Sequence, residues 1–500
     1  MDARRSTMPA AAREVAMESI DFDTRSVFVD GHWQAASFGR TLPLVNPSDG
    51  SELTQIARGG PAEIDAAVRA AQAALDGAWG RSSAAERGRI LQGMSQRVSE
   101  LADVLARMEA LDVGKPVKQG LADAHALARY LEFYGGAADK VMGETIPFTP
   151  GYTALTLREP HGVTGHIVPW NYPMQIIGRS VGAALAMGNA CVLKPAEEAC
   201  LTALAFARIA NDCGLPGGAL NVVPGLGEEA GAALARHHGV AHLSFTGSVA
   251  VGQQVQAAAA KNTVPVTLEL GGKSPQLVFA DADLDAALPF LVNAGVQNAG
   301  QTCSAASRIL VQASVFDEVV ARMAERYRKL VVGPAIADPD VGPLISARQK
   351  EVVQSYLAAA RDSGLRVAAQ ADLASSLPRE GCYVAPTLLA PVRSDHRLAQ
   401  EEIFGPVQVV IAFDDEADAI AQANGTDYGL VAGVWTRDGS RALRVARALR
   451  CGQVFVNNYG AGGGVELPFG GVKRSGHGRE KGFEALYGFS TLKTIAIKHD

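Results

Sequence analysis

The 500-residue sequence lacks the features that mark several classes of protein. It has six cysteines without paired short spacings, which argues against a disulfide framework or a zinc site. Its charges are scattered and sum to −6, which disfavours a nucleic acid or an anionic membrane as the main partner. The longest uncharged run, 286–307, is interrupted by Asn and Gln, so no membrane helix is expected. We therefore expect no metal, no nucleic acid and no membrane partner.

No secretory signal is expected at the N-terminus, because its early arginines are followed by no apolar core before Glu14. We predict a loose, Ala-rich tail over residues 1–18. A cytoplasmic location is expected, since a reactive thiol survives in a reducing compartment. What is present is ordinary for a globular protein: 48% hydrophobic and 20% charged residues, with length enough for two or three domains.

Helical and strand patterns alternate along most of the chain, which predicts an α/β fold with a mostly parallel sheet. The rhythm restarts after the Gly271-Gly272 pair, so we place the boundary between two α/β domains there. Helices are expected over 61–76, 84–110, 201–213, 316–330 and 417–423, and strands over 162–168, 190–193, 219–223, 276–279, 408–413 and 453–456.

Two further segments fit neither domain. Residues 145–158 alternate around Pro150-Gly151 and predict a β-hairpin, and 489–498 predict a terminal strand. Such strands would expose edges unless something pairs with them. The alternative is that each is an edge strand on its own domain.

Cys303 and Glu269 are the first candidates for chemistry. Cys303 lies among small residues in 300–304 and could be a buried apolar thiol. Glu269, however, lies inside the apolar run 264–270, where burial should raise its pKa into the range of a general base. The alternative for Glu269 is a structural pair with Lys273. A nucleophilic thiol needs a base and an oxyanion donor, and the sequence offers both types.

The donor candidate is Asn171, which stands between two prolines at the end of an expected strand. The flanking prolines favour an extended turn that can aim the amide at a developing oxyanion. The segment 168–173 could equally be a plain turn.

Three segments at strand ends suit a nucleotide. Gly225, Gly227 and Gly231 resemble a GxGxxG pattern with one residue too many, which is a weak fingerprint. Ser248 opens a helical stretch, where amide groups suit a pyrophosphate. The segment 194–197 supplies a Lys and a Glu that can hydrogen-bond a ribose. Each of these segments could also be an ordinary loop.

Seven motifs then occur in one order between about residue 43 and the C-terminus. They are PWNYP, GNACVLKPAE, FTGS, LELGGKSP, GQTCSAASR, EEIFGP and PFGGVKRSG. In this order they resemble the aldehyde dehydrogenase superfamily. The resemblance implies oxidation of an aldehyde to the carboxylic acid with NAD and water, through a thiohemiacetal and a thioester on Cys303.

Roles follow from the matching positions. The resemblance implies that Cys303 is the nucleophile, Glu269 the general base, and Asn171 with the Cys303 amide the oxyanion hole. Acyl transfer to coenzyme A is disfavoured, because this chain keeps the Glu that the acylating members usually lack. The separation of 303 − 269 = 34 residues is also similar to the family's.

The resemblance further implies an NAD site. Lys194 and Glu197 would hold the adenosine ribose, and Glu197 would repel a 2′-phosphate, so NAD is expected rather than NADP. Ser248 and Trp170 would hold the pyrophosphate, and Glu402 and Phe404 the nicotinamide ribose and ring. The full expected set is Ile167, Pro169, Trp170, Lys194, Ala196, Glu197, Gly227, Gly231, Phe245, Gly247, Ser248, Val251, Leu270, Gly271, Glu402 and Phe404.

For the substrate, Arg179 occupies a tunnel position that many members fill with Trp. An Arg there is similar to both the semialdehyde-acid and the aromatic-aldehyde branches, while Gln297 lacks the second arginine of the former. We therefore expect an aromatic or a carboxylate-bearing aldehyde. The expected substrate residues are Tyr172, Arg179, Gln297, Thr302, Ser304 and Phe469.

Helix geometry places the Arg179 head roughly 10 Å or more from the reacting carbon, at the tunnel wall or mouth. The alternative is a surface arginine that pairs with a neighbouring acid.

Ser180 stands where many members carry a Lys that is linked to proton relay with the Glu that matches Glu480. The resemblance therefore does not imply that relay here. The glycine-rich loop 457–468 leaves the shape of the substrate wall undefined.

The family's architecture implies a Rossmann-like NAD-binding domain (19–142 and 161–270), an α/β catalytic domain (271–482) and a small β oligomerisation arm (143–160 and 483–500). A homodimer or homotetramer is implied.

Two alternative interpretations of the function stay open. A non-catalytic structural or binding member should lack Cys303, Glu269 or Asn171, and a cofactor-free thiol hydrolase should place a His beside the Cys.

Overall fold

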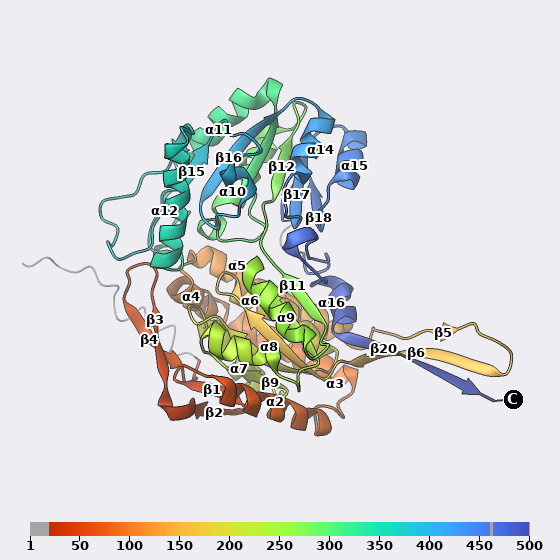
Figure 1. The fold of residues 1–500 in the computed structure, drawn as a ribbon. Coiled ribbons are helices and arrows are strands. Elements are labelled where there is room, and N and C mark those ends of the chain that lie inside the picture. The colour runs from red at the N-terminus through yellow and green to blue at the C-terminus, as the bar shows by residue number, and fades with distance from the viewer. Residues whose placement is uncertain (1–19, 461–463, 500) are drawn as a thin grey trace, which may run out of the picture.

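The computed structural model describes residues 20–460 and 464–499, so the predicted tail over 1–18 lies outside the described residues. The chain forms a mixed α/β structure with two large, mostly parallel sheets and a small antiparallel one (Figure 1). The eight-stranded sheet has the order β19-β11-β10-β7-β8-β9-β1-β2, and the seven-stranded sheet the order β14-β15-β16-β13-β12-β17-β18. The mostly parallel α/β character was predicted from the alternation of patterns.

The eight-stranded sheet has a parallel centre with antiparallel edges. Its central strands are apolar and buried along nearly their whole length, as expected for parallel strands covered by helices on both faces. The strands are β1 (Ser26–Val29), β2 (His32–Ala35), β7 (Val163–Val168), β8 (Ala190–Pro195), β9 (Leu220–Val222), β10 (His242–Thr246), β11 (Val266–Glu269) and β19 (Gly476–His477).

Helices pack around this sheet: α2 (Pro61–Asp76), α3 (Ala84–Glu100), α4 (Ala102–Asp112), α5 (Val117–Ala137), α6 (Pro173–Ala186), α7 (Leu201–Asp212), the π-turn η2 (Gly227–Gly231), α8 (Ala232–Arg236) and α9 (Val249–Ala260). The single helix expected over 84–110 is wrong, because the chain breaks at Leu101. The Leu101 amide is shared between the carbonyls of Arg97 and Val98. No Gly or Pro marks this break, so the sequence carried no signal for it.

The seven-stranded sheet is parallel except for one edge strand. Its strands are β12 (Pro275–Val278), β13 (Arg308–Gln312), β14 (Val367–Gln370), β15 (Thr387–Leu389), β16 (Val407–Phe413), β17 (Val431–Trp435) and β18 (Gln453–Val456). Its helices are α10 (Leu284–Val296), α11 (Phe316–Arg328), α12 (Ala347–Asp362), α13 (Arg397–Gln400), α14 (Glu416–Asn424) and α15 (Gly439–Ala448).

The chain passes from one large sheet to the other between β11 and β12, which encloses the predicted boundary at Gly271-Gly272. It returns once, since β19 lies within the predicted catalytic segment yet pairs with β11. The exact domain limits stay a prediction. Short 3-10 turns lie between these elements along the chain: η1 (Ser37–Gly39), η3 (Gln297–Gly300), η4 (Ala313–Val315), η5 (Ala335–Ala337) and η7 (Lys473–Ser475).

The three-stranded sheet projects from the body of the molecule (Figure 1). It consists of β5 (Thr145–Ile146), β6 (Tyr152–Pro160) and β20 (Ser490–Lys498), which follows α16 (Gly482–Gly488). β20 pairs antiparallel with β6 along its whole length. The alternative in which hairpin and terminal strand were edges of separate domains is therefore wrong. A further hairpin joins β3 (Thr41–Val45) and β4 (Glu52–Ala57). Within the described parts of the chain, no helix is long and apolar enough to cross a membrane.

Candidate active site

A cavity of about 400 Å³ brings together residues from the ends of both large sheets. Cys303 and Glu269 both line it, although they belong to different segments of the chain. Eight other residues that the sequence analysis singled out also line it: Pro169, Trp170, Asn171, Gly247, Ser248, Gly271, Glu402 and Phe404. The predicted catalytic residues and about half of the predicted cofactor residues thus share one space.

Cys303 follows the tight turn η3, in which Asn298 and Ala299 have φ of 49° and 53°. Gly300 has φ of 73°, and a Cβ there would collide with the Gly405 backbone, so this turn requires a glycine. The turn leaves Cys303 partly exposed at the cavity. Burial raises the pKa of the thiol to about 11. The thiol is therefore protonated at neutral pH and needs a base to become a nucleophile.

Glu269 is the last residue of β11 and is 1% exposed. Neither of its carboxylate oxygens has a hydrogen-bond partner among the described residues. Burial raises its pKa well above the ordinary value, and nearby Glu480 adds to the rise, while Arg179 lowers it. The alternative pair with Lys273 is wrong, because within the described chain the Lys273 Nζ contacts no partner. Glu269 therefore has the burial and the unsatisfied oxygens of a general base.

Asn171 lies in the turn between β7 and α6 and is 5% exposed. Its side-chain Nδ2 donates to the Gln301 carbonyl at 3.0 Å. In return, the Asn298 Nδ2 donates to the Asn171 carbonyl at 3.0 Å. These bonds fix the amide beside the turn that carries Cys303, and its second N–H is left for another acceptor.

Trp170 and Phe404 form one wall of the cavity, with ring centroids 5.4 Å apart and planes at 81°. Phe404 has φ of 55°, which fixes an unusual turn after Glu402. The Glu402 Oε1 accepts from the Gly272 amide at 3.0 Å, and burial raises the pKa of this carboxyl to about 7. A Cβ on Gly271 would collide with the Glu402 carboxylate, so the close approach needs a glycine.

The N-terminus of α9 opens onto the cavity at Gly247 and Ser248. The Ser248 Oγ accepts from the Val251 amide at 3.3 Å and caps the helix. Such an N-terminus presents amide groups and the positive end of the helix dipole to an anion. Phe245 and Leu270 are buried behind it, and Val251 itself is 44% exposed.

A separate polar cluster gathers the residues expected at the adenosine ribose. The Lys194 Nζ donates to the Glu197 Oε2 at 2.8 Å, and the Gly227 amide donates to the Glu197 Oε1 at 3.5 Å. Gly231 faces the Lys194 side chain without a side chain of its own. The remaining expected residues, Ile167 and Ala196, lie in β7 and directly after β8.

The expected substrate residues surround Cys303 from the other side. The Tyr172 hydroxyl is 2.9 Å from the Thr302 Oγ1, and the Ser304 carbonyl accepts from the Tyr459 hydroxyl at 2.6 Å. Phe469 is 6% exposed, and the half-buried Gln297 begins η3.

Arg179 is 6% exposed and forms an ion pair through its Nε with Glu480. Its guanidinium lies 5.0 Å from the centroid of the Phe469 ring. The alternative of a surface arginine is therefore wrong, although the expected acidic partner exists. Lys481 lies over the same ring at 5.3 Å, and the sequence analysis missed it.

Sequence reasoning also missed several residues that line the cavity: Glu198, Thr246, Ile345, Ser346, Arg348, Gln349 and Val352. Four of them flank or begin α12. The Ser346 Oγ accepts from the Gln349 amide at 3.2 Å, so the S-x-x-Q pattern does mark a helix start. That signal predicts a helix but not that its N-terminus faces a cavity.

The profile of the aldehyde dehydrogenase family matches residues 33–495. Human retinal dehydrogenase 2 is 40% identical over 486 residues, which cover 96% of this chain and 93% of that protein. A solved structure of a Burkholderia cenocepacia protein assigned as an aldehyde dehydrogenase is 62% identical, with a TM-score of 0.94 over 95% of this chain and 100% of that one.

A third relative is the indole-3-acetaldehyde dehydrogenase AldA of P. syringae, solved as a mutant in complex with NAD+ and IAA. It is 39% identical, with a TM-score of 0.93, and the match covers 98% of this chain and 99% of that one. The family and the fold class predicted from the sequence are confirmed. The chain belongs to the aldehyde dehydrogenase family.

Proposed function

We propose that the protein oxidises an aldehyde to the carboxylic acid with NAD and water, through a thiohemiacetal and a thioester on Cys303. The observation that carries this proposal is the shared cavity of Cys303, Glu269 and Asn171. Glu269 is buried there with both oxygens unsatisfied, while the thiol beside it is protonated at neutral pH.

The chain's own residues would act in the following order. Glu269 takes the proton from the Cys303 thiol, and the thiolate Sγ bonds to the aldehyde carbon. The carbonyl oxygen becomes an oxyanion, to which the Asn171 amide and the Cys303 backbone amide donate. NAD, when bound, accepts the hydride of the aldehyde carbon. Glu269 passes the thiol proton to solvent before it takes a proton from water, whose oxygen bonds to the thioester carbon. As the C–S bond breaks, the acid leaves and the Cys303 thiolate takes the proton that Glu269 holds.

The cavity fits the dinucleotide. Ser248 and the α9 N-terminus suit the pyrophosphate, Glu402 the hydroxyls of the nicotinamide ribose, and Phe404 the nicotinamide ring. Lys194 and Glu197 suit the adenosine ribose. A cofactor of this kind is bound in the P. syringae relative, which supports NAD as the cofactor.

For the substrate we favour an aromatic aldehyde. The charge of Arg179 is already matched by Glu480, so it is not a spare cation for a substrate carboxylate. Phe469 packs with Cys303, Phe455 and Tyr459 in one apolar cluster, which suits a ring. The AldA relative is named for an aldehyde that carries an indole ring.

A carboxylate-bearing aldehyde is the second candidate. The observation that favours it is Lys481, which adds a second cation over the Phe469 ring beside Arg179. Measurement of kcat/KM for phenylacetaldehyde and for succinic semialdehyde separates the two candidates. A higher value for phenylacetaldehyde supports the aromatic aldehyde, and a higher value for succinic semialdehyde supports the carboxylate-bearing one.

The test of the proposed function is absorbance at 340 nm with NAD and a panel of aldehydes. Cys303→Ala should remove activity by several orders of magnitude while NAD still binds. Cys213→Ala is the matched control, because this half-buried thiol lies outside the 400 Å³ cavity. Residual turnover of the Cys303→Ala variant above about one per cent would refute the covalent route.

Two rivals are weakened by the same geometry. A non-catalytic member has no reason to keep Cys303, Glu269 and Asn171 around one cavity. A cofactor-free thiol hydrolase needs a His at the Cys, and none of the ten histidines lines this cavity.

The homodimer or homotetramer stays a proposal as well. β20 exposes Leu492 and Ile497, at 56% and 48%, on a sheet that projects from the body. Exposed apolar side chains on such an arm support its contact with a second copy. The cytoplasmic location stays a prediction.

A further inference from the structure

A second cavity, of about 10 Å³, lies at the amino ends of the parallel strands of the seven-stranded sheet. Lys273 and Ser274 line it just before β12, and Arg308 lines it at the first position of β13. The chain around Tyr428 and the segment 449–451 close it from the side of β17 and β18. No carboxylate is among the residues that line it.

Two cations are buried at this cavity, and neither forms an ion pair with a carboxylate of the described residues. Lys273 and Arg308 are each 1% exposed. The Lys273 Nζ has no hydrogen-bond partner in residues 20–460 and 464–499. Within the described residues, Arg308 donates to backbone carbonyls alone, namely those of Lys273, Gln422 and Ala423 at 2.9, 2.9 and 2.8 Å. Hydrogen bonds to carbonyls orient the guanidinium but do not neutralise its charge.

Burial of uncompensated charge is costly, and the structure shows its effect. Burial and the charge of Arg308 lower the pKa of Lys273 to about 7, against the opposite effect of Glu402 and Glu401. Burial also lowers the pKa of the Arg308 guanidinium to about 9. Since a guanidinium keeps its proton in proteins, the site has at least one buried positive charge in need of an anion.

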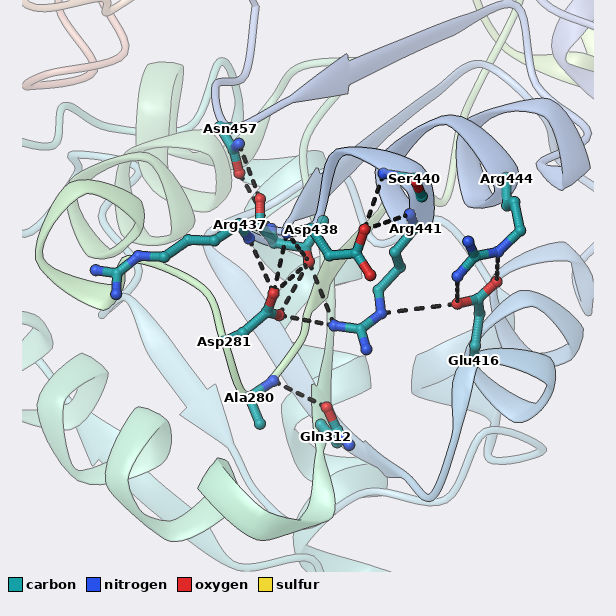
Figure 2. A network of polar contacts seen from close by, with 11 residues as sticks. Ala280, Asp281, Gln312, Glu416, Arg437, Asp438, Ser440, Arg441, Arg444 and Asn457 are labelled. Atoms are coloured by element: carbon teal, nitrogen blue, oxygen red, sulfur yellow. Dashed lines mark hydrogen bonds and ion pairs between the residues drawn. The ribbon is translucent and has the colours of Figure 1, made fainter.

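The carboxyl ends of the same strands present the opposite situation (Figure 2). There Asp281 accepts from the Thr436 hydroxyl, from two backbone amides and from Arg441 at 2.8 Å. Glu416 pairs with Arg444 at 2.8 Å in the same network. The protein thus matches arginines with carboxylates at one end of this sheet. At the other end, no carboxylate is among the described residues that line the cavity, and Glu401 and Glu402 act on Lys273 from outside that lining.

We propose that the small cavity binds one monatomic anion, chloride or an equivalent halide, between Lys273 and Arg308. The size restricts the choice, because a cavity of about 10 Å³ admits no more than one small particle and excludes phosphate or a carboxylic acid. The chemistry also fits, because the ammonium, the guanidinium and the buried Ser274 hydroxyl are all hydrogen-bond donors.

The site would stabilise the loop that joins the two sheets. The Gly272 amide donates to Glu402, and the Gly272 α-carbon packs against the Cys303 backbone. Lys273, the next residue, turns to the halide cavity. A bound halide would therefore hold one side of a loop whose other side contacts the active site. This inference does not rest on the proposed function, because its test measures binding and stability rather than turnover.

The first test is thermal unfolding in potassium gluconate, with chloride replacing gluconate at constant ionic strength. A rise in Tm of about 1–3 °C is expected once chloride exceeds its Kd tenfold, and Tm should rise further with the logarithm of the chloride concentration. Lys273→Met should abolish the chloride-dependent rise. Lys329→Met, which removes an exposed lysine from α11's C-terminal end, should keep it.

The second test does not depend on any variant. Crystals of the wild-type protein grown in bromide should show an anomalous peak between Lys273 and Arg308. Absence of the peak, together with equal Tm in chloride and gluconate, would overturn the proposal and leave a water beside a neutral lysine. A chloride-dependent rise that persists in Lys273→Met would also overturn it, because the halide would then bind elsewhere.

Discussion

Arg179 in α6 and Glu480, three residues after the end of β19, form a buried ion pair next to the carboxyl of Glu269. Glu480 is fully buried, and its Oε1 also accepts from the Ser244 hydroxyl at 3.0 Å. Glu480 raises the pKa of Glu269 and Arg179 lowers it. Arg179 therefore compensates two buried carboxylates at once, in addition to contacting Phe469.

The first prediction concerns Arg179→Ala. Removal of the cation leaves Glu480 buried and unpaired, which should cost about 3–5 kcal/mol of stability. The pKa of Glu269 should rise without Arg179, so the acidic limb of the kcat profile should move to higher pH. Activity should fall for phenylacetaldehyde and propanal alike, and Arg179→Lys should restore part of it.

The matched control is Arg129→Ala, which breaks exposed pairs with Glu132 and Glu466 and should change little. The measurements are urea unfolding and kcat against pH. A loss confined to KM for ring-bearing or acidic aldehydes, with unchanged stability, would make Arg179 a substrate-binding residue instead.

The second prediction is that Glu269→Gln forms the thioester more slowly, because the Cys303 thiol loses its base, and hydrolyses it more slowly still. Gln keeps the shape of the side chain and cannot take a proton from water. Rapid mixing with an aldehyde and NAD should show a burst of NADH of about one equivalent per site, followed by slow turnover. Steady turnover at the wild-type rate would mean that the buried carboxyl is structural.

The third prediction is a preference for NAD over NADP of about ten- to hundredfold in kcat/KM. The Glu197 carboxylate, oriented by Lys194 at 2.8 Å, should repel a 2′-phosphate on the adenosine ribose. Glu197→Ser should narrow the gap by raising kcat/KM with NADP. Glu484→Ser, which removes an exposed acid in α16, is the control. Equal efficiency of the wild type with both cofactors would refute the assignment.

The sequence was sufficient to predict those features that depend on neighbouring residues in the chain. Apolar runs ended by Pro or Lys-Pro located β7 and β8, because parallel strands must be apolar on both faces. Glu269 was visible because a carboxylate inside such a run is costly unless it serves a purpose. The pairing of the terminal strand with the hairpin followed from the resemblance rather than from the residues themselves.

The sequence was insufficient to predict contacts that form only when distant segments of the chain pack together. Nothing near Arg179 indicates that Glu480 would be its partner, because that pair forms only when β19 returns to the first sheet. The same holds for Ser346 and Arg348 at the cavity. The unpaired Lys273 could not be found either, since a lysine after two glycines usually reaches solvent.

A cluster of buried histidines supplies the last prediction. His161 and His242 stack with ring centroids 4.9 Å apart, and His242 and His166 lie 5.0 and 5.5 Å from the Phe489 ring. Phe489 directly precedes β20, so this cluster lies at the base of the projecting arm. Burial lowers the pKa of all three histidines, that of His166 to about 3.

Because the unfolded chain binds protons on these histidines below about pH 6.5 and the folded chain does not, acid should favour unfolding. The contribution of His166 is fully present above pH 6.5 and should fall by about 2 kcal/mol at pH 5. Urea unfolding at pH 7.5 and 5.0 measures this difference, and His166→Gln should reduce it. His125→Gln, at an exposed position of α5, should leave it unchanged. The same pH dependence in His166→Gln as in the wild type would show that other groups cause the acid lability.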